Sequence, residues 1–598
     1  MTFDVPIVYP CYGNLFPTIP HRCLDTPFQK GSLICPVLQS SCHRKLVRPS
    51  TEDQSLIIKG KDDSLTYSTI NMLNEADFRH KNRHSMNLRS TSSREERSSQ
   101  NFDSKEARVN ANNSMSKVFR NPLILDTIFA KLDLPDLMTS RLVCREWNDV
   151  ASTLLGKRAY LHANKLKSSK VTPVSDKLTR HLLISDRCDQ SKKKMTNVIT
   201  KAFTQVSELT RKIKFAATRK EFIPTFLERM RTLGSTKVQR VDIISAWGRD
   251  KVYKFPAEAY QKLPPKPSLT SLRLRLLPSF MCTRTPSNEE FQPLVQILLD
   301  SAPNLTTLGV EASLYPDLEG CKNLKVLKFE YIAHLLDYRR KLSLTKLTDM
   351  LGQVKDSLIE VELGIWTSTG NTEPVTGGPV MSKLTTLAIH PTDGNQILNF
   401  FDEDHFPQLK TLRVHDIHQD SCSSSFLKLW RRHRGVQSIA LSLNSFACWE
   451  DEEFRGKIVD LFPSVKEINL ALKDIDFNDI PALSEIIEPF KTWDLERVSV
   501  HVDGVSKISV LMDVLKAMSG LKGVKSARFS DVDIKEDQFS PHIQDLILQS
   551  RGFKSVEIAG FMEPEIVERI RSIFEASGAP IHFSGGVVHK EISGVYSS

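Results

Sequence analysis

A short pattern of apolar positions, apolar-x-x-apolar-x-apolar, recurs along the chain from residue 238 onward and predicts the architecture of this part. Seven consecutive intervals between copies measure 25 to 30 residues. Each copy predicts a short strand, and a period in the high twenties is typical of a solenoid with one strand and one helix per repeat. The copies begin at Val238, Leu269, Leu305, Leu324, Leu358, Leu384, Leu409, Val436, Val465, Leu495, Val524 and Phe553.

The segments between these strands carry apolar residues at helical intervals, as the repeat model requires. The clearest stripe is Phe291, Leu294, Val295, Leu298 and Leu299. Two further stripes are Phe454, Ile458, Leu461 and Phe462, and Leu511, Leu515 and Met518. Residues 366–381, rich in Thr, Gly, Pro and Asn, predict a loop in place of a helix.

A second apolar pattern, near residue 120, predicts a small helical unit. Ile124, Ile128 and Leu132 follow one another at four-residue steps. The string Asp133-Leu-Pro-Asp136 then predicts a helix start. Asp133 can accept hydrogen bonds from backbone N–H groups, and the negative charge of Asp136 is favourable at the positive end of the helix dipole. The next stretch, residues 137–155, continues at helical intervals. A helical unit of about 35 residues rarely stabilises itself, so we expect it to need a partner surface.

These residues resemble the F-box motif. The matching strings are Asn121-Pro-Leu-Ile-Leu-Asp-Thr-Ile-Phe-Ala-Lys-Leu132, then Asp136-Leu137, then Leu142-Val-Cys-Arg-Glu-Trp147. The chain departs from the family at Arg120-Asn121, where the family has Leu-Pro, and at Leu123, where it has Glu. A plain helical hairpin that caps the repeats, with the same residues as its core, is the alternative interpretation.

The repeats resemble the leucine-rich-repeat family in architecture. That family places Asn or Cys eight residues after the first leucine, and among the better repeats only Asn444 clearly fills this position. The fold class expected is therefore α/β: a small all-α F-box module followed by an irregular leucine-rich-repeat solenoid.

An F-box followed by leucine-rich repeats resembles the substrate receptors of cullin-type ubiquitin ligases. This resemblance implies that the chain is not an enzyme, docks on a Skp-family adaptor and its cullin, and holds an unknown target protein through the repeats. The residues implied for adaptor binding are Pro122, Ile124, Leu125, Ile128, Phe129, Leu132, Leu137, Val143, Cys144 and Trp147. A ligase-independent interaction scaffold is the first alternative.

In a solenoid of this kind, residues between the pattern positions line the concave side of the sheet, which is commonly a binding surface. Any one polar residue there is more often present for solubility than for binding. The candidate target-binding residues are Arg273, Lys328, Glu362, His390, Arg413, Asn469 and Arg528.

The positive charge of the chain is concentrated in residues 151–235, where 19 Lys and Arg face 6 Asp and Glu, a net of +13. Residues 236–598 hold 42 against 48, a net of −6. A basic segment can attract nucleic acid, which is the second alternative, but no known reader motif is present. The apolar spacing of Ile199, Phe203, Val206 and Leu209 favours a solvated basic face on a connecting helix.

The remaining predictions concern organisation and location. The expected parts are a disordered arm (1–115), the F-box (116–162), a basic helical linker (163–235), the solenoid (236–585) and a tail (586–598). Cys11, Cys23, Cys35 and Cys42 lack a close Cys-x-x-Cys pair, so they predict free thiols and no metal site. No phosphate loop, long apolar run or cofactor motif is present, and we expect a cytoplasmic or nuclear protein without membrane association.

Overall fold

The computed structural model describes most of the chain beyond residue 118, within the compact unit Thr69–Ser598. The described residues are 119–165, 175–186, 191–217, 219–234, 237–246, 255–277, 291–332, 342–366, 377–390, 400–417, 427, 430–443, 452–472, 487–560 and 562–585. The expected disordered arm and tail, the four N-terminal cysteines, Asn444 and residues 367–376 of the expected loop lie outside them.

Three helices form a helical module at the start of the described chain: α3 (Pro122–Phe129), α4 (Leu134–Ser140) and α5 (Arg145–Arg158). Each of the first two begins at a residue that accepts a backbone N–H. Asn121 Oδ1 accepts from the amide of Leu123 at 3.0 Å, and Asp133 Oδ1 accepts from the amide of Asp136 at 2.8 Å. The predicted helix start at Asp133 is therefore confirmed. Pro122 is the first residue of α3, where its missing N–H costs nothing.

A single parallel sheet, with its strands in sequence order, runs through the rest of the described chain. Parallel neighbours need a crossover connection, so every strand begins a new repeat. The strands are β1 (Leu161–His162), β2 (His181–Ser185), β3 (Lys212–Ala217), β4 (Arg240–Ala246), β5 (Ser271–Leu277), β6 (Thr307–Glu311), β7 (Val326–Ile332), β8 (Glu360–Trp366), β9 (Thr386–His390), β10 (Thr411–Ile417), β11 (Ser438–Leu443), β12 (Glu467–Leu472), β13 (Arg497–Asp503), β14 (Val524–Val532), β15 (Ser555–Gly560) and β16 (Ile581–Gly585).

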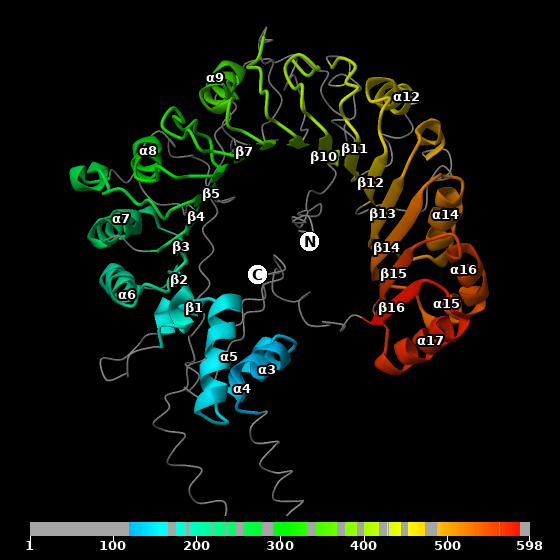
Figure 1. Ribbon diagram of the computed structural model, residues 1–598, viewed down its shortest axis with the longest axis horizontal. Coiled ribbons are helices and arrows are strands. Elements are labelled where there is room, and N and C mark those ends of the chain that lie inside the picture. The colour runs from blue at the N-terminus through cyan, green and yellow to red at the C-terminus, as the bar shows by residue number, and fades with distance from the viewer. Residues whose placement is uncertain are drawn as a thin grey trace, which may run out of the picture. The chain divides into compact units, whose positions relative to one another are not determined.

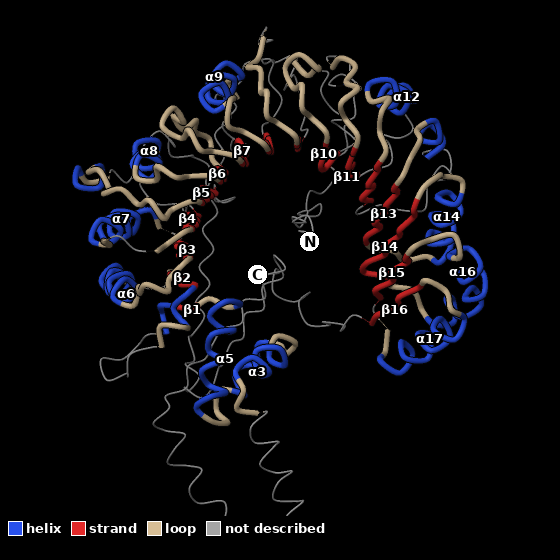
Figure 2. Tube along the Cα trace, viewed as in Figure 1, coloured by secondary structure: helices blue, strands red, loops and turns tan. Residues whose placement is uncertain are grey.

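The helices of this array lie together on one side of the sheet, as Figures 1 and 2 show. The α-helices are α6 (Lys192–Thr204), α7 (Ile223–Thr232), α8 (Gln292–Asp300), α9 (Leu344–Val354), α12 (Glu452–Leu461), α14 (Ile508–Ser519), α15 (Glu536–Phe539), α16 (Ile543–Ser550) and α17 (Pro564–Ser577). Short 3-10 turns also occur: η2 (Ala163–Lys165), η3 (Leu178–Arg180), η4 (Lys220–Phe222), η5 (Ala257–Tyr260), η8 (Glu488–Thr492) and η9 (Ser540–His542). The arrangement is a solenoid-like α/β array.

All twelve strands predicted from the apolar pattern are present. Eleven begin two residues after the first apolar position of their copy, and β14 begins at Val524 itself. The three predicted helical stripes fall on α8, α12 and α14.

The expected basic linker, residues 163–235, is wrong as an assignment, because this segment holds β2, β3, α6 and α7 and is part of the array. The pattern missed these repeats because buried threonines stand where the other copies have an aliphatic residue. Thr179 is 1% exposed and Thr210 is fully buried. Their hydroxyls are satisfied locally: Thr179 Oγ1 donates to the carbonyl of Asp176 at 2.8 Å, and Thr210 Oγ1 accepts from the amide of Ser207 at 3.0 Å.

The expectation of one helix per repeat is also too regular. The connection from β6 to β7, residues 312–325, contains no helix. This connection is short and contains Pro316 and Gly320, so it has no room for a helix with a turn at each end. The connection from β4 to β5 carries only the 3-10 turn η5 among its described residues.

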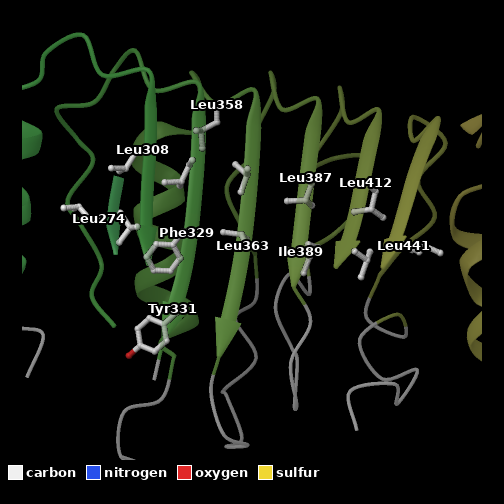
Figure 3. Packing of buried hydrophobic residues seen from close by; sticks show 14 of the residues in the cluster. Leu274, Leu308, Phe329, Tyr331, Leu358, Leu363, Leu387, Ile389, Leu412 and Leu441 are labelled. Atoms are coloured by element: carbon white, nitrogen blue, oxygen red, sulfur yellow. The ribbon is translucent and has the colours of Figure 1, made fainter. Parts of the chain in front are cut away.

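The core of the array is a set of aliphatic rows that cross the strands (Figure 3). One row joins register partners from β2 to β13: Leu182, Ile213, Val241, Leu272, Leu308, Leu327, Val361, Leu387, Leu412, Ile439, Ile468 and Val498. Each such side chain contributes roughly 1.5–3 kcal/mol by leaving water. The side chains that alternate with them point to the opposite face, called here the polar face, which carries residues such as Lys212, Asp242, Arg273, Lys328 and Glu362.

The helical module has a core of its own that is completed by the array. Leu178 of η3 packs among Leu125, Phe129 and Leu137 of the module's cluster. Gly156 of α5 faces the backbone of the same connection so closely that a Cβ there would lie 1.8 Å from the carbonyl oxygen of Lys177. Part of the partner surface that the module needs is therefore supplied by the chain itself.

Candidate functional site

The surface of the helical module is unusually apolar. Among the described residues, twelve large hydrophobic side chains are exposed, and six of them lie between residues 119 and 143. They are Phe119, Leu123, Ile124, Ile128, Leu142 and Val143, with Leu123 78% and Leu142 71% exposed. Exposed apolar residues are ordinary when they are scattered, but such a concentration marks a protein-binding surface.

The structure divides the ten predicted adaptor-binding residues into two groups. Leu125, Phe129 and Leu137 are buried in the module's own core and do not reach its surface. In the folded module these three side chains are therefore core residues, and their predicted part in adaptor binding stays a prediction. Exposed or partly exposed are Pro122, Ile124, Ile128, Leu132, Val143, Cys144 and Trp147.

The burial of the three residues follows from the helix geometry. Leu125 and Phe129 are four positions apart and share one face of α3, whereas Ile124 and Ile128 share the neighbouring face. The sequence could not assign one stripe to the core and the other to a partner, since both are apolar. The exposed Leu123 and Leu142 stand in the strings that resemble the F-box but were not among the predicted adaptor-binding residues.

Trp147 links the module's surface to its core. The indole Nε1–H donates to the carbonyl of Phe119 at 2.9 Å, and the ring meets the edge of Phe129 at a centroid distance of 5.0 Å. A large half-buried aromatic with its N–H satisfied is a stable anchor for the chain that enters α3.

The polar face of the sheet is the second candidate surface. Arg273, Lys328, Glu362, Arg413 and Asn469 lie on one cross-strand row. His390 and Arg528 lie in the next row, two residues further along their strands. The seven predicted target-binding residues are therefore on one face, spread along ten strands.

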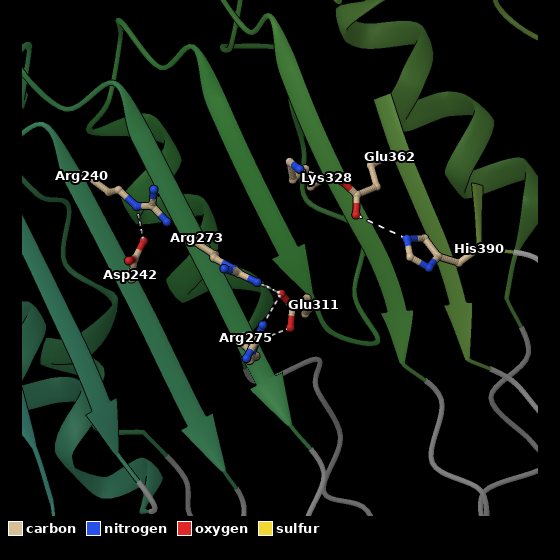
Figure 4. A network of polar contacts seen from close by, with 8 residues as sticks. All are labelled: Arg240, Asp242, Arg273, Arg275, Glu311, Lys328, Glu362 and His390. Carbon is tan, nitrogen blue, oxygen red and sulfur yellow. Dashed lines mark hydrogen bonds and ion pairs between the residues drawn. The ribbon is translucent and has the colours of Figure 1, made fainter. Parts of the chain in front are cut away.

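Near the start of this face, two buried carboxylates each bind two basic side chains; Figure 4 draws Asp242 with Arg240, and Glu311 with Arg273 and Arg275. Asp242 is 5% exposed and lies 3.2 Å from Lys212 Nζ and 2.8 Å from Arg240 Nε. Glu311 is 8% exposed and pairs with Arg273 Nη2 at 2.7 Å and with Arg275. Carboxylates this deep are stable only when paired, so the basic groups are held in fixed positions.

The basic surroundings also affect a histidine on β2. Burial, reinforced by the nearby charges of Lys212, Arg180 and Arg240, lowers the pKa of His181 to about 4. Burial likewise lowers the pKa of Lys212, although Asp242 opposes that shift. His181 is therefore neutral at physiological pH, and the charge here comes from lysine and arginine.

A third carboxylate, Glu362, joins two strands in the middle of the face. Lys328 Nζ donates to it at 2.7 Å, and His390 Nε2 lies 3.4 Å from its other oxygen. Burial alone would raise its pKa, but the hydrogen bond from His390 and the charge and hydrogen bond of Lys328 lower the pKa of Glu362 to about 2. The His390 ring stacks on His415 at 4.7 Å between centroids.

The last strands of the face carry charges in balanced pairs. Arg497 pairs with Glu467, and Arg528 Nε lies 3.7 Å from Glu557. These side chains are 36–65% exposed. They resemble ordinary surface ion pairs rather than a built site.

Sequence reasoning missed Lys212 and Lys214 because it assigned their segment to a linker, and it did not single out Arg240, Asp242 and Glu311 within the expected solenoid. The available signal was the strict alternation of Lys212-Ile-Lys-Phe-Ala-Ala217, which is a strand pattern.

Residues 123–162 match the family model described as F-box-like. This stretch covers the helices of the module and the first strand of the array. No curated protein matches the chain in sequence. The F-box-like domain supports an adaptor-binding role of the kind that ubiquitin ligase receptors have.

Within the described part of the chain, no helix has the length and apolar character needed to span a membrane. In the same residues, no group of three or more His, Cys, Asp or Glu side chains is arranged to hold a metal ion.

Proposed function

We propose that the chain is the substrate-recognition subunit of a cullin-type ubiquitin ligase. Its helical module docks on a Skp-family adaptor, which links it to the cullin, and its array, a divergent leucine-rich-repeat solenoid, holds a target protein. The chain then performs no bond chemistry. It acts by raising the local concentration of the target near the conjugating enzyme, in the reducing environment of the cytoplasm or nucleus.

The observation that carries this proposal is the coincidence of two independent signals on the same residues. The F-box-like match begins at Leu123, and half of the exposed large hydrophobic side chains of the described chain lie at Phe119–Val143. A module that leaves Leu123, Ile128 and Leu142 in water gains stability when another protein covers them, at roughly 25 cal/mol for each Å² of apolar surface.

The junction between module and array supports the same function. Gly156 and Leu178 pack the module against the first repeats, and Asp149 pairs with Lys177 across the junction. A fixed junction keeps a target on the array at a constant position relative to the adaptor, which favours transfer to particular lysines.

The test uses surface substitutions, because the structure separates surface from core. Ile128→Asp with Leu142→Asp replaces two exposed side chains, so the module should still fold while its co-purification with a Skp-family adaptor and cullin is lost. The matched control is Leu548→Asp on α16, where a leucine is 64% exposed far along the chain from the module.

Retention of adaptor and cullin by the Ile128→Asp, Leu142→Asp chain would contradict the proposal. If the unmodified chain co-purifies with the adaptor but not with cullin, that result would instead favour a ligase-independent scaffold.

A further inference from the structure

The polar face has an uneven charge distribution along the strands. From β3 to β6 it carries five basic side chains against two carboxylates, a net of +3; these are Lys212, Lys214, Arg240, Arg273 and Arg275 with Asp242 and Glu311. On β7 and β8 it carries one lysine against three glutamates, a net of −2; these are Lys328 with Glu330, Glu360 and Glu362. A positive zone is therefore followed directly by a negative zone.

Further along the array this polarity ends. The polar face of β11 carries Ser438, Ala440 and Ser442, which have no charge. On later strands basic and acidic side chains form exposed pairs, as in Arg497 with Glu467 and Arg528 with Glu557. The separation of charge is a property of β3–β8 and not of the array in general.

The positive zone is preorganised by its two buried carboxylates. Asp242 and Glu311 each bind two basic side chains, so each cluster holds two basic groups around one carboxylate. The side chains of Arg240 and Arg273 are 41% and 28% exposed, so their guanidinium groups are both fixed and accessible. A fixed cation loses little conformational entropy on binding an anion, which increases affinity.

We propose that the polar face from β3 to β8 binds a segment of the target protein that has an acidic cluster and, beside it, a basic cluster. This inference rests on the proposed function and defines the chemical class of the target. Neighbouring strands are about 4.8 Å apart, so the centres of the two zones are separated by about 14 Å. An extended segment spans this distance in roughly four residues, and a helical one in roughly ten.

A protein segment fits this face better than a nucleic acid. A strand of phosphates that occupied the positive zone would continue over Glu330, Glu360 and Glu362, where like charges repel. A nucleic-acid groove also gains from an uninterrupted row of basic side chains, whereas Asp242 and Glu311 already neutralise part of this one.

The experiment measures binding of fluorescent peptides to the full chain at low and moderate salt. The probe has three glutamates, a four-residue Gly-Ser linker and three lysines. A peptide of the same composition with the charges interspersed, and a twelve-nucleotide oligothymidylate, serve as comparisons. The segregated peptide should bind roughly tenfold more tightly than the interspersed one, since complementary charges align only in the former.

Variants then locate the site. Arg240→Gln with Arg273→Gln should weaken the segregated peptide roughly tenfold, while Arg497→Gln with Arg528→Gln, which removes the same charge from the last strands, should leave it unchanged. Glu311→Gln should tighten binding, because it removes a negative charge and keeps a hydrogen-bond acceptor for Arg273. A gain of binding cannot come from misfolding, so this variant decides the question even if the double variant fails to fold.

Equal binding of the two peptides, tighter binding of the oligothymidylate, or equal effects of the two double variants would overturn the inference. The proposed function is tested separately by adaptor and cullin co-purification, which Arg240→Gln with Arg273→Gln should not alter. If the substituted chain keeps its adaptor and still captures targets, the proposed function stands. Only the inference about the charges of the target would then be overturned.

Discussion

The helical module and the repeat array treat their surfaces in opposite ways. The module leaves six large apolar side chains exposed within residues 119–143, whereas the much longer remainder of the described chain exposes only six more. The array instead presents lysine, arginine, aspartate and glutamate on the face away from its helices. An apolar surface binds through its buried area and its shape, whereas a charged surface binds through the positions of its charges. The module therefore suits one constant partner, and the array suits a partner that is selected by its charges.

The two regions also differ in how their cores are completed. The array has one continuous core from Leu161 to Phe583, in which each repeat covers the next. The core of the module is a separate cluster of a few side chains and takes in Leu178 from the array. The smaller unit therefore completes its core with a side chain of the array.

The largest expected effects come from two neighbouring residues of α3. Phe129 is 1% exposed and Ile128 is 42% exposed. Phe129→Ala should destabilise the module by about 3–5 kcal/mol through the cavity it leaves, and Ile128→Ala by less than about 0.5 kcal/mol. Hydrogen exchange of α3–α5 in the full chain measures both changes. Adaptor binding should fall in both variants, so a folded Phe129→Ala module would contradict the division into core and surface.

The junction gives the next largest effect. Gly156→Ala places a Cβ against the carbonyl oxygen of Lys177, so the helix or the connection has to move, at a cost of about 1–3 kcal/mol. The matched control is Gly352→Ala within α9, where a Cβ meets no atom within 4 Å. That change should stabilise by about 0.5–1 kcal/mol, since glycine is unfavourable inside a helix. Thermal unfolding of the two variants should shift in opposite directions.

The sequence predicted the array from Val238 onward because its strands obey one apolar pattern, and it failed where that pattern carries a polar residue. Thr179 and Thr210 occupy buried positions and form hydrogen bonds with Asp176 and Ser207. The pattern of apolar positions does not predict these hydrogen bonds. The last strand, β16, is preceded by Gly578, with a φ of 63°, in the equivalent position. These first and last repeats therefore lack the full apolar pattern, and the pairing of strands identifies them as repeats.

The candidate surfaces could be predicted in part for a similar reason. The alternation of strands places Arg273, Lys328 and Glu362 on one face, and register then aligns them in one row. Their partners could not be predicted, because Glu311 and His390 come from strands 28 to 38 residues away. In the module, the sequence identified the helices but could not separate the stripe of Leu125 and Phe129 from that of Ile124 and Ile128, since both are apolar.

A smaller effect, which depends on pH, distinguishes the buried charges of the polar face. The folded-state pKa of Glu362, about 2, is below its ordinary value of 4.5. Its stabilising contribution is therefore fully present above about pH 4.5 and is lost as the pH falls towards 2. Glu362→Gln should destabilise the array at pH 7, and the difference from the unmodified chain should shrink over that range. Asn469→Ala, in the same row, removes no titrating group, so its effect in urea unfolding should not vary with pH.

The smallest effect is expected at Arg497, which forms a pair with Glu467 on the balanced part of the polar face. Both side chains are more than one third exposed, so solvent screens their attraction, and Arg497→Gln should change stability by less than about 0.5 kcal/mol. Urea unfolding at 50 mM and 500 mM salt measures this, and the small difference should vanish at the higher concentration. A cost above about 1 kcal/mol would show that the pair is part of a built network. The last strands would then differ from β3–β8 in net charge alone. They would no longer differ in how firmly their charged side chains are held in place.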